Sequence, residues 1–265
     1  MLRWFENRQV YHPTREWNVS PAEAGSSVED VYFTTADGVR LNAWFFPAGK
    51  NSPRASFAAL VCHGNGGNVS HRAGFCQMLV RLGLNAFVFD YRGYGRSEGR
   101  PTEEGTYQDA QAAYRWLRAR GFALQNIIAL GKSLGGAVAT ELALRETVGG
   151  LVLQSAFTSI ADVGEERFPW LPVRRLHRIK YETLKKLPRL QVPVLILHSR
   201  DDETISFSHG ERNFAAITGP KLFVEVNGPH NYRDVANVNR HAEGLEKFLR
   251  QLKQRDKNNP LAPEK

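Results

Sequence analysis

Residues 127–144 read IIALGKSLGGAVATELAL, and this stretch decides the fold class. Ile127–Leu130 is a short apolar run of the kind that forms a buried strand, and Ala137–Leu144 is typical of a helix. Between them the pattern Gly-x-Ser-x-Gly spans residues 131–135, which predicts a sharp turn from strand to helix. The glycines let neighbouring elements approach closely, and the turn projects the hydroxyl of Ser133 above the sheet. Ser133 is therefore the candidate nucleophile.

Two other glycine motifs resemble nucleotide-binding loops, and both depart from the required pattern. Gly131-Lys-Ser ends like a phosphate-binding loop, but Asn126 stands where that loop needs a glycine. Gly64-Asn-Gly-Gly follows a strand, and Asp90 lies further on, as in a dinucleotide fold. Val69 then occupies the third glycine position, where it is too bulky for close packing of helix and strand. We expect no organic cofactor and no metal.

The rest of the chain alternates short apolar runs with helical patterns. The other runs typical of strands buried on both faces of a parallel sheet are Ala58–Cys62, Ala86–Asp90, Leu151–Leu153, Val194–Leu197 and Leu222–Val226. Helical patterns lie at about residues 68–82, 103–119, 134–146, 206–217 and 231–253. Val28–Phe46 is instead typical of a hairpin around the turn Asp37-Gly38. This order predicts an α/β fold with a mostly parallel sheet of about eight strands and helices on both faces.

The chain is expected to form one large domain with short flanking segments. Residues 1–27 form a lead segment, residues 28–254 the α/β domain, and residues 255–265 a polar tail expected to be disordered. Residues 158–190 make one connection about twice as long as its sister connections. Because this insertion follows the carboxyl end of a strand, it predicts a short lid over the ligand site.

The net charge of +8 is concentrated in that insertion, where Arg167–Arg189 holds eight Lys or Arg residues and one acid. Such local basicity argues against a nucleic-acid-binding protein. No apolar run approaches the roughly 18 residues of a membrane span, and Met1–Val10 lacks the apolar stretch of a signal peptide. Cys62 and Cys76 lie in apolar runs typical of buried thiols. A cytoplasmic location is the expectation.

A serine hydroxyl needs a base to become a nucleophile, and the base needs an acid to orient it. In a fold of this order the acid follows a late strand and the histidine follows the last one. Asp201 and Asp202 both come directly after a late apolar run, and spacing does not separate them. His230 follows the last run, in a loop that contains glycine and proline. His63 and His198 each end a strand, where structural hydrogen bonding is expected.

An oxyanion intermediate also needs two backbone N–H donors. Leu134, immediately after the nucleophile, is expected to supply one from the start of its helix. The second donor is expected in the glycine-rich loop after an earlier strand, with Asn65 as the first choice and Gly64 as the alternative.

Five segments together resemble the α/β-hydrolase superfamily of serine hydrolases. They are HGNGGN from His63, FDYRGYGRSEG from Phe89, GKSLGG from Gly131, PVLILH from Pro193 and GPHN from Gly228. The resemblance covers about residues 28–250, and within the superfamily it is nearest to a branch that includes bacterial esterase-like hydrolases and eukaryotic depalmitoylating thioesterases. In that family the acid ends a His-Gly-x-x-Asp loop. The resemblance therefore implies Asp202 as the acid, although Ser199 replaces the loop's glycine.

The activity expected is hydrolysis of a small-molecule carboxylic ester, with small to medium acyl chains, through an acyl-enzyme. The alternatives are a thioesterase acting on acyl-protein or acyl-carrier substrates and a binding module without turnover. Three apolar residues of the insertion are expected to line the acyl pocket: Phe168, Trp170 and Leu171. Four basic residues there are hypothesised to face an anionic lipid surface or a phosphate-bearing thioester: Arg174, Arg175, Arg178 and Lys180.

Overall fold

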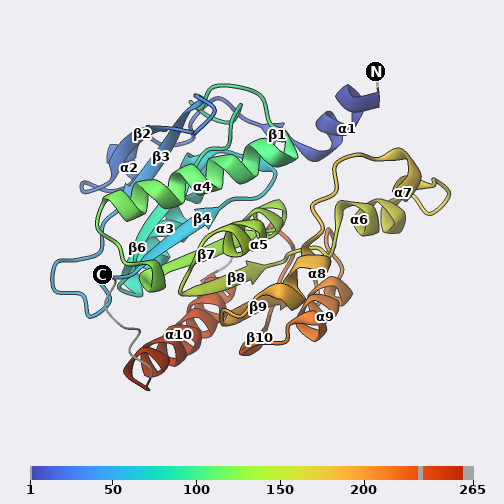
Figure 1. The fold of residues 1–265 in the computed structure, drawn as a ribbon. Coiled ribbons are helices and arrows are strands. Elements are labelled where there is room, and N and C mark those ends of the chain that lie inside the picture. Colours follow the sequence, from blue (N-terminus) through green and yellow to red (C-terminus); the bar gives the residue numbers. More distant parts are fainter. Residues whose placement is uncertain (1, 232–234, 259–265) are drawn as a thin grey trace.

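The computed structural model describes residues 2–231 and 235–258 and is built on a sheet with the strand order β10-β9-β8-β7-β4-β6-β3-β2 (Figure 1). Its strands are β2 (Glu29–Thr34), β3 (Arg40–Phe46), β4 (Ala58–Cys62), β6 (Asn85–Phe89), β7 (Ile127–Lys132), β8 (Gly150–Gln154), β9 (Val194–Ser199) and β10 (Lys221–Val226). Strand β3 runs antiparallel to β2 and β6, and the other pairs are parallel. The predicted eight-stranded, mostly parallel sheet is confirmed.

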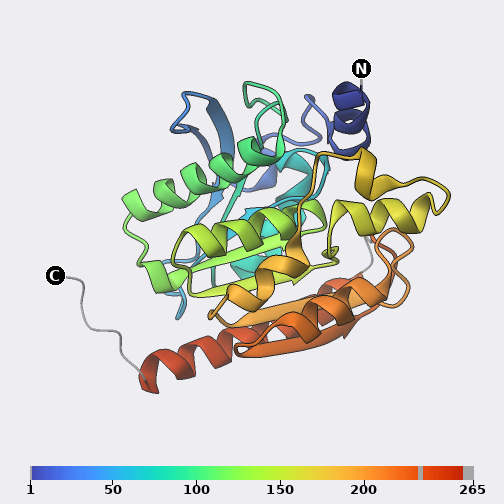
Figure 2. The ribbon, with the colours of Figure 1, turned by 45° about the vertical axis from the view of Figure 1, so that its right-hand side comes forward.

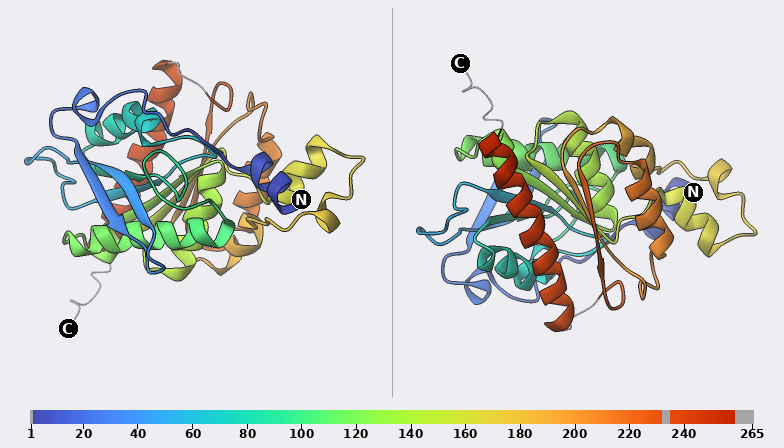
Figure 3. Two further views of the ribbon diagram at one scale, coloured as in Figure 1. Left: turned by 90° about the horizontal axis from the view of Figure 1, so that it is seen from above. Right: turned by 90° about the horizontal axis from the view of Figure 1, so that it is seen from below.

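Helices cover both faces of the sheet, as the alternating sequence pattern predicts. One face carries α3 (Ala73–Arg81) and α10 (Val235–Asn258), and the other carries α4 (Glu103–Ala119), α5 (Leu134–Arg145) and α9 (Phe207–Ala216). Figure 3 shows α10 lying across the sheet when the molecule is seen from below. Helix α10 continues to Asn258, so residues 255–258 are helical rather than disordered, and residues 259–265 lie outside the described part of the chain.

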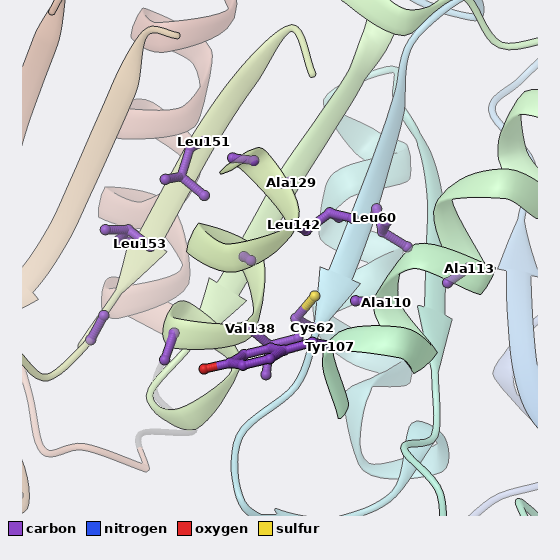
Figure 4. Packing of buried hydrophobic residues seen from close by; sticks show 14 of the residues in the cluster. Leu60, Cys62, Tyr107, Ala110, Ala113, Ala129, Val138, Leu142, Leu151 and Leu153 are labelled. Atoms are coloured by element: carbon purple, nitrogen blue, oxygen red, sulfur yellow. The ribbon is translucent and has the colours of Figure 1, made fainter. Parts of the chain in front are cut away.

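The core follows from the alternation of side chains along each central strand. Leu60 and Cys62 of β4 point to the face covered by α4 and α5, where Figure 4 shows them near Tyr107 and Leu142. Val61, between them, belongs to the opposite cluster with residues of α3 and α10. Because both faces are packed, the central strands contain nearly continuous apolar runs, which is why they are recognisable in the sequence.

The lead segment is folded against the body of the protein, and its Tyr11 and Ala24 are buried in the core. It forms α1 (Leu2–Val10), β1 (His12–Pro13) and α2 (Pro21–Ala24). Strand β1 pairs in parallel with β5 (Gly66–Gly67), a two-residue strand within the glycine-rich loop. The lead segment therefore reaches, through His12 and Pro13, the loop expected to hold an oxyanion donor.

The insertion forms a lid of short helices that projects from the body (Figure 2). Its elements are α6 (Ile160–Arg167), α7 (Val173–Leu176), α8 (Thr183–Lys186) and the 3₁₀ turn η3 (Leu187–Arg189). The remaining 3₁₀ turns are η1 (Val69–Arg72) and η2 (Leu124–Asn126). The lead segment contacts the lid, because the amide of Arg178 donates to a carboxylate oxygen of Glu6 in α1 at 3.1 Å and the hydroxyls of Tyr11 and Tyr181 are 2.9 Å apart. The lid and the lead segment thus enclose the same end of the sheet.

Candidate active site

A cavity of about 760 Å³ opens at the carboxyl edge of the parallel strands. Its wall includes Ser133 at the end of β7, Gly64 and Asn65 after β4, and His230 after β10. The apolar part of the wall comes from Phe157 and from lid residues that include Ile160, Val163 and Phe168. Ligand sites in open α/β sheets form at this edge because the loops that follow the strands converge there.

Ser133 adopts a backbone conformation that a residue with a side chain rarely occupies, with φ 52° and ψ −118°. Its amide donates to the carbonyl of Gln154 at 2.9 Å, which fixes the turn to the neighbouring strand. The flanking glycines are sterically required. A Cβ on Gly131 would lie 2.1 Å from the carbonyl oxygen of Gly135, and one on Gly135 would lie 1.9 Å from that of Cys62. The Gly-x-Ser-x-Gly spacing is thus explained by contact distances.

Asp202 rather than Asp201 contacts the histidine. Nδ1 of His230 lies 2.8 Å from Oδ2 and 3.0 Å from Oδ1 of Asp202. Oδ1 also accepts from the amides of Thr204 at 3.0 Å and Ile205 at 2.8 Å. The carboxylate of Asp201 accepts instead from the amide of Gly228 at 3.2 Å.

Burial acts to raise the pKa of Asp202, but the hydrogen bonds from His230 and from the amide of Ile205 outweigh it and lower that pKa below its ordinary value. The carboxylate therefore stays ionised at neutral pH. An ionised acceptor at Nδ1 favours the tautomer of His230 that leaves Nε2 unprotonated and able to accept a proton.

Asn65 and Leu134 both line the cavity, as does Gly64. Leu134 is the first residue of α5, where backbone N–H groups have no partner within the helix. The N–H of Asn65 belongs to the same peptide group as the carbonyl of Gly64. This carbonyl is fixed by a contact of 2.7 Å with Nδ1 of His63. In a trans peptide the N–H points opposite to the carbonyl. His63 therefore orients the Asn65 amide, a role that sequence reasoning missed.

His63 is itself enclosed by buried groups. Nε2 of His63 lies 3.5 Å from Oδ1 of Asp90, which also accepts from the amide of Val69 at 2.8 Å. The hydroxyl of Tyr91 donates to the carbonyl of His63 at 2.9 Å. The buried His198, by contrast, contacts the carbonyl of Ile205 at 2.9 Å and supports the loop that carries Asp202.

Only one of the three apolar lid residues expected at the acyl pocket lines the cavity. Phe168 is in the wall, whereas Trp170 and Leu171 are 73% and 43% exposed and lie outside it. The physical reason is a tight turn, closed by a hydrogen bond of 2.9 Å from the amide of Leu171 to the carbonyl of Phe168. This turn directs the side chains of Trp170 and Leu171 away from the cavity and toward solvent.

The basic lid residues singled out in the sequence are also away from the cavity wall. Arg174 forms ion pairs with Asp162 and Glu165 of the neighbouring helix. Arg178 and Lys180 are exposed, and the side chain of Arg175 lies outside the described part of the structure. The cations that do line the cavity are Arg72, Lys132 and Arg167.

Two kinds of feature are absent from residues 2–231 and 235–258. No three His, Cys, Asp or Glu side chains there are grouped so that they could hold a metal ion. Among the helices of the same residues, none has both the length and the apolar character that crossing a membrane requires.

Comparison with known proteins agrees with this geometry. Residues 53–172 match the family described as serine aminopeptidase, S33. An uncharacterized protein of Mycobacterium tuberculosis is 38% identical over 258 residues, covering 94% of this chain and 89% of that protein. Alpha/beta hydrolase domain-containing protein 17B of Homo sapiens is 33% identical over 241 residues, covering 89% of this chain and 80% of that protein.

Solved structures with the same fold are more distant in sequence. An esterase of Pyrococcus furiosus matches with a TM-score of 0.70 at 20% identity, covering 92% of this chain and 98% of that one. An acetyl xylan esterase from Paenibacillus sp. R4 matches with a TM-score of 0.68 at 20% identity, covering 94% and 92%. Taken with the identity to the human relative across most of both chains, these matches show that the chain belongs to the α/β-hydrolase superfamily.

Proposed function

We propose that this protein is a serine hydrolase that cleaves carboxylic esters of small to medium acyl chains through an acyl-enzyme. The observation that carries the proposal is the position of Ser133. It stands in a strained turn at the head of α5, in the wall of the cavity that also holds His230, whose Nδ1 is hydrogen-bonded to Asp202. This is the arrangement in which a hydroxyl can be activated by a correctly oriented imidazole.

The proposed reaction has two halves. Oγ of Ser133 attacks the ester carbonyl while Nε2 of His230 takes its proton, and the amides of Asn65 and Leu134 donate to the oxyanion. The tetrahedral intermediate expels the alcohol, which receives the proton from His230, and an ester on Ser133 remains. In the second half His230 takes a proton from water, the resulting hydroxide attacks the acyl carbon, and the acid leaves as Ser133 regains its proton.

The apolar part of the cavity supports an acyl group of modest length. Phe157, Ile160, Val163 and Phe168 come together there within a total volume of about 760 Å³. Cavities of a few hundred Å³ suit small molecules rather than polymers. A thioester could acylate Ser133 by the same steps, so thioester hydrolysis is the second outcome that the assay must separate.

The test is hydrolysis of p-nitrophenyl esters of increasing acyl length, compared with matched thioesters. The Ser133→Ala variant is expected to lower kcat by about 10⁴- to 10⁶-fold. Ser208→Ala, on the exposed surface of α9, is the matched control and should retain full activity. Mass spectrometry of the quenched wild-type reaction should find the acyl group on the peptide that contains Ser133. Turnover that survives in Ser133→Ala, or a wild-type protein without turnover on any ester or thioester, refutes the proposal.

A further inference from the structure

The polar part of the cavity wall carries one sign of charge. Arg72 comes from η1, Lys132 from the end of β7 and Arg167 from α6, so three separate elements each contribute a cation. Among the described residues that line the cavity there is no aspartate or glutamate. Cations that converge on a cavity from separate elements raise the local concentration of an anionic ligand.

Arg72 is held by a backbone carbonyl rather than by a carboxylate. Its guanidinium donates to the carbonyl of Gly66, while its Nε is buried and has no hydrogen-bond partner within the described residues. The buried Arg92 shows the contrast, because it pairs with the carboxylates of Asp37 and Asp109 at 2.8 Å each. Arg72 is half-buried, and this burial lowers the pKa of its guanidinium, so an anion bound beside it would be favourable.

Asp90 does not neutralise this charge. Asp90 acts on Arg72 only through its longer-range field, and one of its oxygens is already engaged by the amide of Val69. Arg72 and Asp90 form no ion pair in the part of the chain that the structure describes. Arg72 thus lines the cavity that contains Ser133 without a carboxylate partner in the described part of the chain.

Lys132 adds a second cation next to the first. It directly precedes Ser133, and its Nζ lies 3.4 Å from Oδ1 of Asn231. Burial, and then the positive charge of Arg72, lower the pKa of Lys132 to about 8. The positive charges of Arg72 and Lys132 repel one another when the cavity holds no anion. An anion bound between them would stabilise both charges.

We propose that the substrate of this cavity carries a carboxylate or phosphate group that Arg72 binds, assisted by Lys132 and Arg167. The inference rests on the proposed hydrolase function and names its substrate class: esters or thioesters with an anionic group within reach of the scissile bond. The group can belong to the acyl half, as in a monoester of a dicarboxylic acid, or to the leaving half, as in a phosphate-bearing thiol. The shared chemistry is an oxyanion that accepts two parallel hydrogen bonds from a guanidinium.

The test uses two pairs of substrates that differ only in charge. The first pair is the p-nitrophenyl ester of pentanoic acid and the mono-p-nitrophenyl ester of glutaric acid. The second pair is butanoyl-pantetheine and butanoyl-phosphopantetheine. The readout is the ratio of kcat/KM for the anionic member to kcat/KM for the neutral one, so a general loss of activity in a variant cancels.

The wild-type ratio should exceed one in at least one pair, and that pair identifies the half that carries the charge. Arg72→Gln should lower the same ratio by about 10- to 100-fold, because a charge-assisted hydrogen bond is lost. Arg167→Gln, on the exposed end of α6, should lower it by about two- to fivefold. Arg178→Gln, an exposed lid arginine outside the cavity wall, is the matched control and should leave the ratio unchanged.

Two further measurements keep the outcome decisive. If Arg72→Gln does not fold, inorganic phosphate and glutarate should still inhibit wild-type hydrolysis of the neutral ester competitively, and less so in Arg167→Gln. Wild-type ratios at or below one in both pairs, or ratios equal to wild type in both cavity variants, overturn the inference. If hydrolysis requires Ser133 but does not depend on the charge of the substrate, only this inference is wrong and the proposed function is retained. If turnover survives in Ser133→Ala, the proposed function itself is wrong.

Discussion

Replacing Ser133 by glycine should stabilise the protein while abolishing its activity. The backbone at Ser133 has φ 52° and ψ −118°, and a residue with a Cβ is strained there by about 1–3 kcal/mol. Alanine keeps the Cβ and the strain, whereas glycine removes both but loses about 1 kcal/mol in backbone entropy. The difference favours Ser133→Gly over Ser133→Ala by up to about 2 kcal/mol. For a chain of this size that corresponds to a rise in Tm of up to roughly 8 °C.

The assay is thermal unfolding of the two inactive variants side by side, followed by circular dichroism. Comparing glycine with alanine at one position isolates the Cβ, because neither variant has the hydroxyl. Ala139→Gly, buried in the middle of α5, is the control for the ordinary cost of glycine in a helix and should lower the Tm. If Ser133→Gly melts at or below the temperature of Ser133→Ala, the turn does not store strain and the reasoning about the nucleophile's conformation is refuted.

Three further predictions concern the acid, the packing and the cavity wall. Asp202→Asn should lower kcat by about 10⁴-fold while Asp201→Asn stays near wild type, measured on one p-nitrophenyl ester. Hydrogen bonds in the folded protein hold the pKa of Asp202 below 3.8, the value of an unperturbed aspartate. The ionised side chain therefore contributes its full stabilisation above pH 3.8, and this stabilisation is lost as the pH falls through the pKa of the folded state. The gap in urea-unfolding free energy between wild type and Asp202→Asn should therefore narrow in acid, and a gap that widens contradicts this sign. Gly135→Ala should lower the free energy of unfolding in urea by more than about 3 kcal/mol, since its Cβ would meet the carbonyl of Cys62. Gly74→Ala is the control: its Cβ would enter open space, so the free energy of unfolding should be unchanged or rise by up to about 1 kcal/mol. Phe168→Ala should raise KM for longer acyl esters severalfold, and an unchanged KM would remove Phe168 from the acyl pocket.

The sequence was informative wherever a local pattern determines a local structure. The strands β4, β6, β7, β8 and β9 each contain a nearly continuous apolar run because both of their faces are packed, so these runs stand out in the sequence. The turn at Ser133 was equally legible, because contacts of about 2 Å at the neighbouring positions permit only glycine there. The acid was not resolved by spacing, since Asp201 and Asp202 differ only in the direction that the loop gives each side chain.

Features assembled from distant segments could not be predicted in the same way. Strand β1 has two residues and no period, and its partner β5 lies more than fifty positions away. Arg72 follows β4 and Arg167 follows β8, so they reach one cavity from distant parts of the chain, and neither stands in a motif. The basic window of the lid is conspicuous in the sequence, yet Arg174 is held by acids of its own lid. Composition located the charge, but only the tertiary structure shows which cations face the cavity.

The same logic gives the lead segment a role in the site. The amide of His12 donates to the carbonyl of Asn65 at 3.0 Å, and the hydroxyl of Tyr94 donates to the same oxygen at 2.8 Å. On the other side of Asn65, His63 holds the carbonyl of Gly64. One peptide that flanks the Asn65 side chain is therefore fixed by groups outside the glycine-rich loop, and the other by His63 at the start of that loop. A loop rich in glycine is flexible on its own, so the rigidity that the proposed oxyanion donor needs must come from such contacts. Because Tyr11 ties the same segment to Tyr181 of the lid, the elements that would position this donor also close the cavity.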